Sequence, residues 1–210
     1  QYSLVFELVS GQSTEHARYL RSFNYSDHAL GQFIDRLRET GLAKKSIVFI
    51  LADTANPMGE HNNNHTLVKY LYEENLRIPL LIIADGRTQA DVIASLSSQV
   101  DLLPTVMDML GIEDQQHSIG QSLMRQQSDR SVFFNNPFHL AYYGLRQNDL
   151  KFLYSALDNQ QYVFDLAKDP TESINVVNEH PEFAQRSLKA VANMAGLHNY
   201  LYSEQKFTKP

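Results

Sequence analysis

The stretch that decides the fold is Ile47–Pro79, which reads IVFILADTANPMGEHNNNHTLVKYLYEENLRIP. An apolar run ends just before Asp53, a polar loop follows, and a second apolar run begins after Pro79. Runs that are apolar on both faces are typical of strands buried between two helical layers. In an open α/β sheet, ligands collect beyond the carboxyl ends of the strands, so the position of Asp53 makes it a candidate functional residue.

The segment before this stretch predicts a β-α-β unit. Residues 3–9 are apolar on both faces and predict a buried strand. Ser13 and Thr14 can cap a helix whose apolar residues recur at helical spacing, and Gly41 is typical of a helix end. A helix between two strands predicts that residues 3–9 and 47–52 are parallel neighbours joined by a right-handed crossover.

Further along, residues 79–84 predict a third strand, and residues 99–110 predict a short helix that Gly111 closes. Strands that alternate with helices indicate an α/β domain. We place this domain at residues 1–125.

From Ser131 onward the pattern changes to short aromatic-rich runs separated by Asn, Asp, Gly and Gln, which predicts an antiparallel sheet. Residues 181–197 predict a final helix with apolar side chains on one face. Residues 126–210 are therefore expected to form a small antiparallel sheet with a C-terminal helix.

The composition excludes several classes of function. The chain has 210 residues, 43% hydrophobic and 20% charged, which suits an ordinary globular protein with one substantial core. A net charge of -6 disfavours a nucleic-acid surface, and the absence of cysteine excludes disulfides, thiolate zinc sites and cysteine nucleophiles. The longest apolar run is too short to cross a bilayer, and the first residues predict a strand rather than a signal peptide.

Several short motifs in Ile47–Pro79 carry a resemblance to a known family: Asp53-Thr54-Ala55, Gly59-Glu60-His61, Lys69, Tyr72-Glu73-Glu74 and Arg77-Ile78-Pro79. The stretch resembles the sulfatase branch of the alkaline phosphatase superfamily. There a strand runs into Asp-His-Gly or Asp-Asn-Gly, followed by Gly-Glu-His, a lysine, Tyr-Glu-Glu and Arg-Val-Pro. Further segments resemble the family in the same order: Tyr25-Ser26-Asp27, Val100-Asp101-Leu102-Leu103-Pro104-Thr105, Gly120-Gln121-Ser122-Leu123, Gly144-Leu145-Arg146 with Lys151-Phe152, and Phe164-Asp165-Leu166 with Asp169-Pro170-Thr171-Glu172 and Asn175.

The resemblance implies the C-terminal half of the family's catalytic domain. The expected fold is part of an alkaline-phosphatase-like α/β/α sandwich, followed by the small antiparallel sheet and the C-terminal helix. The family's paired metal-binding aspartates and its Cys/Ser-x-Pro-x-Arg nucleophile motif are absent from this sequence. The missing N-terminal half is then a partner, and the resemblance implies a periplasmic or otherwise extracytoplasmic location, with membrane anchoring through an upstream segment.

The resemblance also assigns roles to individual residues. Asp53 and Thr54 occupy metal-ligand positions, for calcium or for magnesium, manganese or zinc. Lys69 corresponds to the lysine that contacts the sulfate, where a cation stabilises charge on the transferred group. Three polar residues take substrate-contact positions: Gln12, His61 and His65. At one metal position and one substrate position the family has stronger ligands, since Thr54 replaces His or Asn and Gln12 replaces a histidine.

Each of these residues also has a purely structural interpretation. Asp53 can cap the turn that follows the strand. The two histidines can be exposed loop residues, and Lys69 a surface lysine. Glu73, Glu74 and Arg77 are expected in surface ion pairs or contacts that hold the fold.

Three functional hypotheses follow. The first is the C-terminal portion of a hydrolase of sulfate or phosphate esters, inactive as this fragment because half of the site is absent. The second is a non-catalytic relative that keeps the fold for binding or regulation in a membrane protein. The third is a relative of the transferases that move phosphoethanolamine or phosphoglycerol groups.

Overall fold

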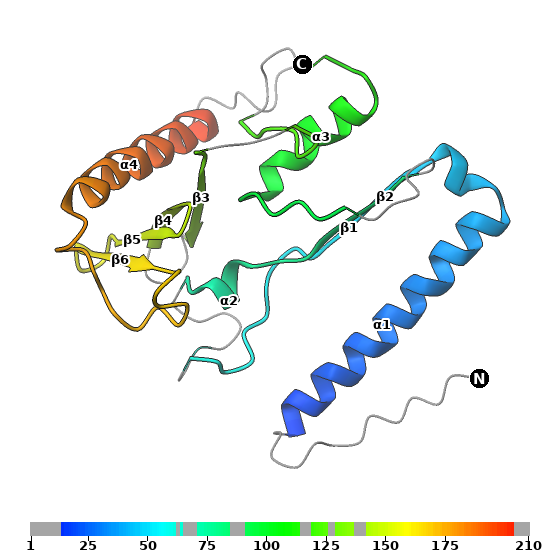
Figure 1. Ribbon diagram of the computed structural model, residues 1–210, viewed down its shortest axis with the longest axis horizontal. Helices are drawn as coiled ribbons and strands as arrows, with labels where there is room; N and C mark the ends of the chain where they lie inside the picture. The colour runs from blue at the N-terminus through cyan, green and yellow to red at the C-terminus, as the bar shows by residue number, and fades with distance from the viewer. Residues whose placement is uncertain are drawn as a thin grey trace.

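The computed structural model describes residues 14–61, 64, 71–84, 91–113, 119–125, 129–136 and 142–203. Helices and strands alternate in the first part, and four consecutive strands precede the last helix (Figure 1). The helical elements are α1 (Thr14–Glu39), η1 (Leu42–Lys45), α2 (Glu73–Leu76), η2 (Gln99–Asp101), α3 (Leu102–Met109) and α4 (Pro181–Ser203). The strands are β1 (Ile47–Leu51), β2 (Leu80–Ala84), β3 (Ser131–Asn136), β4 (Tyr142–Gln147), β5 (Leu150–Ser155) and β6 (Gln160–Asp165).

The long helix predicted between Ser13 and Gly41 is confirmed as α1. It ends at Glu39, and Gly41 follows with a φ of 73°, a left-handed conformation that favours glycine. The predicted strand at residues 3–9 lies outside the described residues, so its parallel pairing stays a prediction. The main described contact of α1 is with η1, and Phe23 and Phe33 on this helix are 61% and 52% exposed.

The strands β1 and β2 form an antiparallel pair in which Ile47 lies opposite Ala84 and Leu51 opposite Leu80. Both strands lie where the sequence predicts them, but the expectation that they are buried is wrong for the described residues. Neither strand contains a buried residue, and Leu81 is 54% exposed. The physical reason is that no described helix has an extensive contact with either strand.

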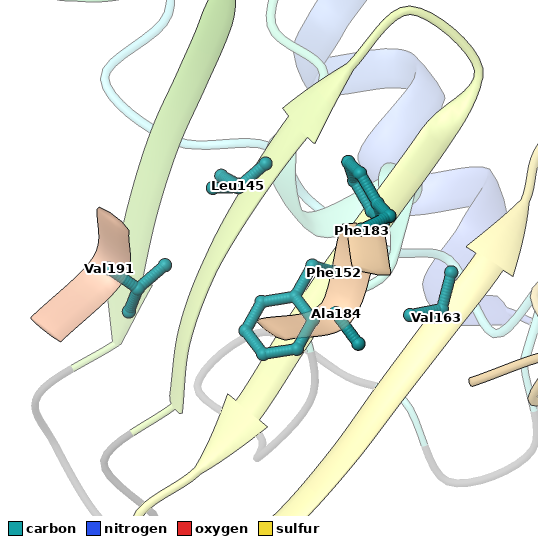
Figure 2. Packing of buried hydrophobic residues seen from close by; sticks show 6 residues of the cluster. All are labelled: Leu145, Phe152, Val163, Phe183, Ala184 and Val191. Carbon is teal, nitrogen blue, oxygen red and sulfur yellow. The ribbon is translucent and has the colours of Figure 1, made fainter. Parts of the chain in front are cut away.

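The four strands β3 to β6 form an antiparallel sheet in chain order, as predicted. The predicted C-terminal helix is confirmed as α4, and the structure places it on one face of this sheet. Figure 2 shows the core between them, where Phe152 and Val163 of the sheet, both fully buried, meet Phe183 and Val191 of α4. Full burial of such side chains contributes about 1.5–3 kcal/mol each, so this core fixes the helix on the sheet.

The opposite face of the same sheet is covered by the segment that leads into α2. Leu71 packs there with Tyr142, Leu153 and Phe164. Residues 71–76 therefore pack on the sheet, although they precede it in sequence by more than fifty residues. The domain boundary between residues 125 and 126 stays a prediction.

The predicted short helix is confirmed as η2 followed by α3, and Gly111 closes it with a φ of 67°. The fully buried carboxylate of Asp101 accepts two hydrogen bonds from the Arg130 guanidinium at 2.8 and 2.9 Å. It also accepts the backbone N–H groups of Ser98 at 2.7 Å and Gln121 at 2.9 Å. Four donors on a buried carboxylate hold the start of α3 against residues 121 and 130.

Candidate functional site

The loop that follows β1 carries the strand-end aspartate. Asp53 and Thr54 are both exposed. Oδ1 of Asp53 accepts the backbone N–H of Thr54 at 2.9 Å, and the Thr54 hydroxyl donates to the carbonyl of Ala55 at 3.1 Å. The aspartate therefore caps its own turn, which uses one oxygen for structure. Oδ2 makes no hydrogen bond with the described residues, and Asp53 keeps its place at the carboxyl end of β1.

The backbone of this loop is held from the start of η2. The side-chain amide of Gln99 donates to the carbonyl oxygens of Ala52 and Asp53, each at 3.3 Å. Because Asp101 fixes the same turn of helix, the support of the loop extends from the buried Asp101 carboxylate to the strand end. The backbone of Asp53 is thus positioned by Gln99 as well as by β1.

The loop then turns at Gly59, whose φ of 94° is accessible to glycine with little strain. His61 follows and meets two other segments. Its Nδ1 lies 2.6 Å from Oε2 of Glu74 in α2, and its Nε2 lies 2.5 Å from the carbonyl oxygen of Thr171. The imidazole also stacks on the ring of Tyr72, with centroids 3.8 Å apart and planes 3° from parallel. The interpretation of His61 as an exposed loop histidine does not fit this geometry.

Asn64 completes this cluster. It is fully buried, and its side-chain amide donates to Oε1 of Glu74 at 2.5 Å and to Oδ1 of Asn75 at 2.8 Å. Asn75 returns a hydrogen bond to Oδ1 of Asn64 at 3.2 Å. Each buried amide group thus finds a partner, and the loop is fastened to α2 at two points.

The two ionisable groups of this cluster shift in opposite directions. Burial lowers the pKa of His61, but the bonds to the Thr171 carbonyl and the Glu74 carboxylate outweigh it, and the pKa is raised above 6.5. Burial raises the pKa of Glu74, but the bonds from Asn64 and His61 outweigh it, and the pKa is lowered below 4.5. Both shifts favour the ionised form of the pair.

A second charged cluster joins α2 to the sheet. Lys151 of β5 is fully buried; its Nζ lies 2.7 Å from Oε2 of Glu172 and 3.3 Å from Oε1 of Glu73. Arg146 of β4 bonds Oε2 of Glu73, and Lys151 also lies 5.6 Å from the ring centroid of Phe134. Two cations and two carboxylates therefore balance in charge, as burial of ionised groups requires.

Burial dominates the titration of this second cluster. It lowers the pKa of Lys151, against the opposing effect of Glu172 and Glu73. It also raises the pKa of Glu172, against the opposing effect of Lys151. The opposite charge beside each group limits these two pKa shifts but does not reverse them.

Three of the predicted site residues, Gln12, His65 and Lys69, lie outside the described residues, so their roles stay predictions. Asp53 and His61 are described, but the structure does not bring them into contact. No three His, Asp or Glu side chains gather as a metal site within the described ranges. Asp53 could therefore supply one ligand of a metal site, and the other ligands are not among the described residues. None of the described helices is long and apolar enough to cross a membrane.

The sequence alone does not identify Lys151 and Glu172 as partners, although both stand in quoted motifs. A weak indication exists, because Lys151 lies between apolar residues in a strand of a predicted sheet. A lysine in such a position needs carboxylates nearby if it is buried. Which carboxylates these are depends on the tertiary fold.

Sequence comparisons place the chain beside known hydrolases. The sulfatase family model matches residues 6–112. Arylsulfatase K of Bos taurus is 28% identical, over 99% of this chain and 44% of the relative. Arylsulfatase K of Gallus gallus is 27% identical, over 91% of this chain and 41% of the relative. The chain thus spans less than half the length of the curated relatives that it matches.

Solved structures support the fold. A protein in complex with its substrate D-glucosamine-2-N,6-O-disulfate has a TM-score of 0.58 at 23% identity, and the match covers 85% of this chain and 39% of that one. A phosphonate monoester hydrolase from Silicibacter pomeroyi has a TM-score of 0.56 at 21% identity, covering 83% and 38%. The predicted fold class, an α/β portion followed by an antiparallel sheet and a helix, is confirmed.

Proposed function

Because the chain belongs to the sulfatase family, we propose that it forms the C-terminal part of a hydrolase that cleaves sulfate esters, with Asp53 as one ligand of a divalent metal ion. The observation that carries this proposal is the position of Asp53, at the carboxyl end of β1 and inside the matched residues. A carboxylate suits hard cations, so calcium is the first candidate, before magnesium, manganese or zinc. We propose Lys69 as the cation that stabilises charge on the transferred group.

We further propose that the rest of the catalytic domain packs on α1 and on the pair β1 and β2. These elements carry apolar side chains that the described residues leave exposed, among them Phe23, Phe33, Leu80 and Leu81. Large apolar side chains exposed on neighbouring segments are candidates for burial in an interface. The match to less than half of each relative supports the same partner, the N-terminal half of the protein.

The full-length protein tests this function with aryl sulfate and aryl phosphate as substrates. We expect metal-dependent turnover of the sulfate ester, and a loss of about 10²-fold or more in Asp53→Asn. The control Asp158→Asn, in the exposed turn between β5 and β6, should show no such loss. We expect the 210-residue chain to be inactive alone. Equal turnover by wild type and Asp53→Asn would contradict the role of Asp53, and preference for the phosphate ester would contradict the substrate class.

A second candidate function is a non-catalytic relative that binds a sulfated ligand or a protein. Thr54 favours it, since its hydroxyl is a poorer neutral ligand than the histidine or asparagine of the family. A full-length protein that is folded but turns over neither ester would support this candidate. The extracytoplasmic location stays a prediction.

A further inference from the structure

Three segments that are distant in sequence meet at the ring of His61. They are the loop that follows Asp53, the residues that lead into α2, and the turn that contains Thr171. The imidazole bonds a carboxylate on one side and a backbone carbonyl on the other, and its face lies on Tyr72. His61 is about one-fifth exposed, and Glu74 is less exposed still, so water competes weakly for these bonds.

Both groups that the ring nitrogens face are hydrogen-bond acceptors. A carboxylate and a carbonyl have no hydrogen to donate, so each ring nitrogen must carry its own hydrogen to make these bonds. Neutral imidazole carries only one. We propose that His61 is held as an imidazolium and acts as a proton-dependent clasp, which positions the loop after Asp53 against α2 and the Thr171 turn.

The charged groups around the ring favour this protonation state. Glu74 faces it from α2, and Glu172 adds a negative charge from the turn. Glu73 is directed away, toward Lys151 and Arg146. On the loop itself, the Glu60 carboxylate accepts the backbone N–H of Met58 at 2.7 Å. The flat face of Tyr72 is also electron-rich, which suits a cationic ring.

The direction of each pKa shift defines where the clasp is complete. The pKa of His61 is raised, so its contribution is fully present below 6.5 and is lost as the pH rises through the folded-state value. The pKa of Glu74 is lowered, so its contribution is fully present above 4.5 and is lost as the pH falls through the folded-state value. Both contributions are therefore fully present between pH 4.5 and pH 6.5. The contribution of His61 is lost as the pH rises further.

This role makes His61 a positioning residue, because both ring nitrogens are already bonded within the protein. The substrate contact that the sequence predicts for His61 stays a prediction. The clasp does not depend on the proposed hydrolysis, because it would set the pH at which the loop is ordered in an enzyme or in a binding protein alike. Its test therefore measures the ring and the loop directly.

The first measurement is ¹⁵N NMR of the ring nitrogens in the full-length protein, with His61 assigned through His61→Gln. We expect both nitrogens of His61 to be protonated at pH 6, and the titration midpoint to lie above 6.5. Titration at or below 6.5, or one nitrogen without a proton at pH 6, would overturn the proposal. This result is independent of any catalytic assay.

The second measurement is hydrogen exchange at the amides of His61 and Asn64, which bond Glu74 and the His61 carbonyl. Their protection should fall above the titration midpoint, by roughly tenfold for each pH unit that separates this midpoint from 6.5. His61→Gln cannot be charged, so its loop should be less protected at pH 6 and show no such step. The matched control His180→Gln, just before α4, should keep the step. Protection of these two amides that does not change with pH in the wild-type protein would contradict the clasp.

Discussion

The backbone N–H of Glu73 donates to Oε1 of Glu172 at 2.6 Å, although 99 positions separate the two residues in sequence. Their neighbours extend the contact, because Glu74 and the carbonyl of Thr171 both bond His61. Two consecutive residues of one segment thus meet two consecutive residues of another. Glu73 faces the sheet, and Glu74 faces the loop of the candidate site.

Replacement of the buried lysine should be strongly destabilising. Lys151→Met leaves Glu73 and Glu172 without the ammonium that balances them, and removal of one partner from a buried ion pair costs about 3–5 kcal/mol. Urea unfolding should show this as a lower midpoint at pH 7. The variant Lys168→Met should stay close to wild type, because Lys168 is 81% exposed where it pairs with Asp165. Similar losses in the two variants would contradict the role of Lys151.

The buried Asp101 should require an arginine opposite it. Arg130→Lys cannot reproduce the two parallel bonds to the carboxylate, so we expect a loss of about 1–3 kcal/mol in the free energy of unfolding. The control is Arg125→Lys, because Arg125 is 74% exposed where it pairs with Asp108. Denaturant unfolding of both variants gives the comparison. A larger effect at Arg125 than at Arg130 would show that Asp101 is not the anchor of α3.

Two glycines should respond to alanine in opposite directions. A Cβ at Gly120 would lie 2.0 Å from the carbonyl oxygen of Val100, so Gly120→Ala must shift the backbone and should cost about 1–3 kcal/mol. A Cβ at Gly31 in α1 meets nothing within 4 Å, so Gly31→Ala should stabilise by about 0.5–1 kcal/mol. Thermal unfolding of each variant measures the difference. Stabilisation by Gly120→Ala would mean that residues 100 and 120 do not approach so closely.

Restoring the family residue after Asp53 should strengthen metal binding in the full-length protein. Thr54→Asn supplies an amide oxygen, which is a good ligand for calcium. We expect calcium affinity to rise on the order of tenfold, the effect of changing one group around a metal. Isothermal titration calorimetry measures it, with Thr54→Ser as the control that keeps only a hydroxyl. Unchanged affinity in Thr54→Asn would place the metal elsewhere.

Much of the fold follows from local pattern in the sequence. The helical spacing before Gly41 and the aromatic runs after Ser131 depend on nearby residues, so α1 and the strands β3 to β6 lie where predicted. Strand exposure could not be predicted in this way. The apolar runs of β1 and β2 indicate strands, but their burial depends on which elements lie against them in space.

The candidate site likewise contains residues that could be predicted from the sequence and contacts that could not. Asp53 could be found because its position at a strand end is itself a sequence pattern. The partners of His61 could not, because Glu74 is 13 residues away and Thr171 is 110 residues away. Such contacts depend on how α2 and the turn at Thr171 pack on the sheet. The sequence contains the charged residues but not their pairing.

The meander of β3 to β6 has a consequence for the order of folding. Each strand pairs with the next one in the chain, so every ladder closes a short loop. β1 and β2 instead pair across residues 52–79, which carries a larger entropic penalty for loop closure. Low contact order is associated with fast folding. We expect the four-stranded sheet to form before the β1–β2 pair, so that the C-terminal sheet provides the surface on which the segment around α2 later docks.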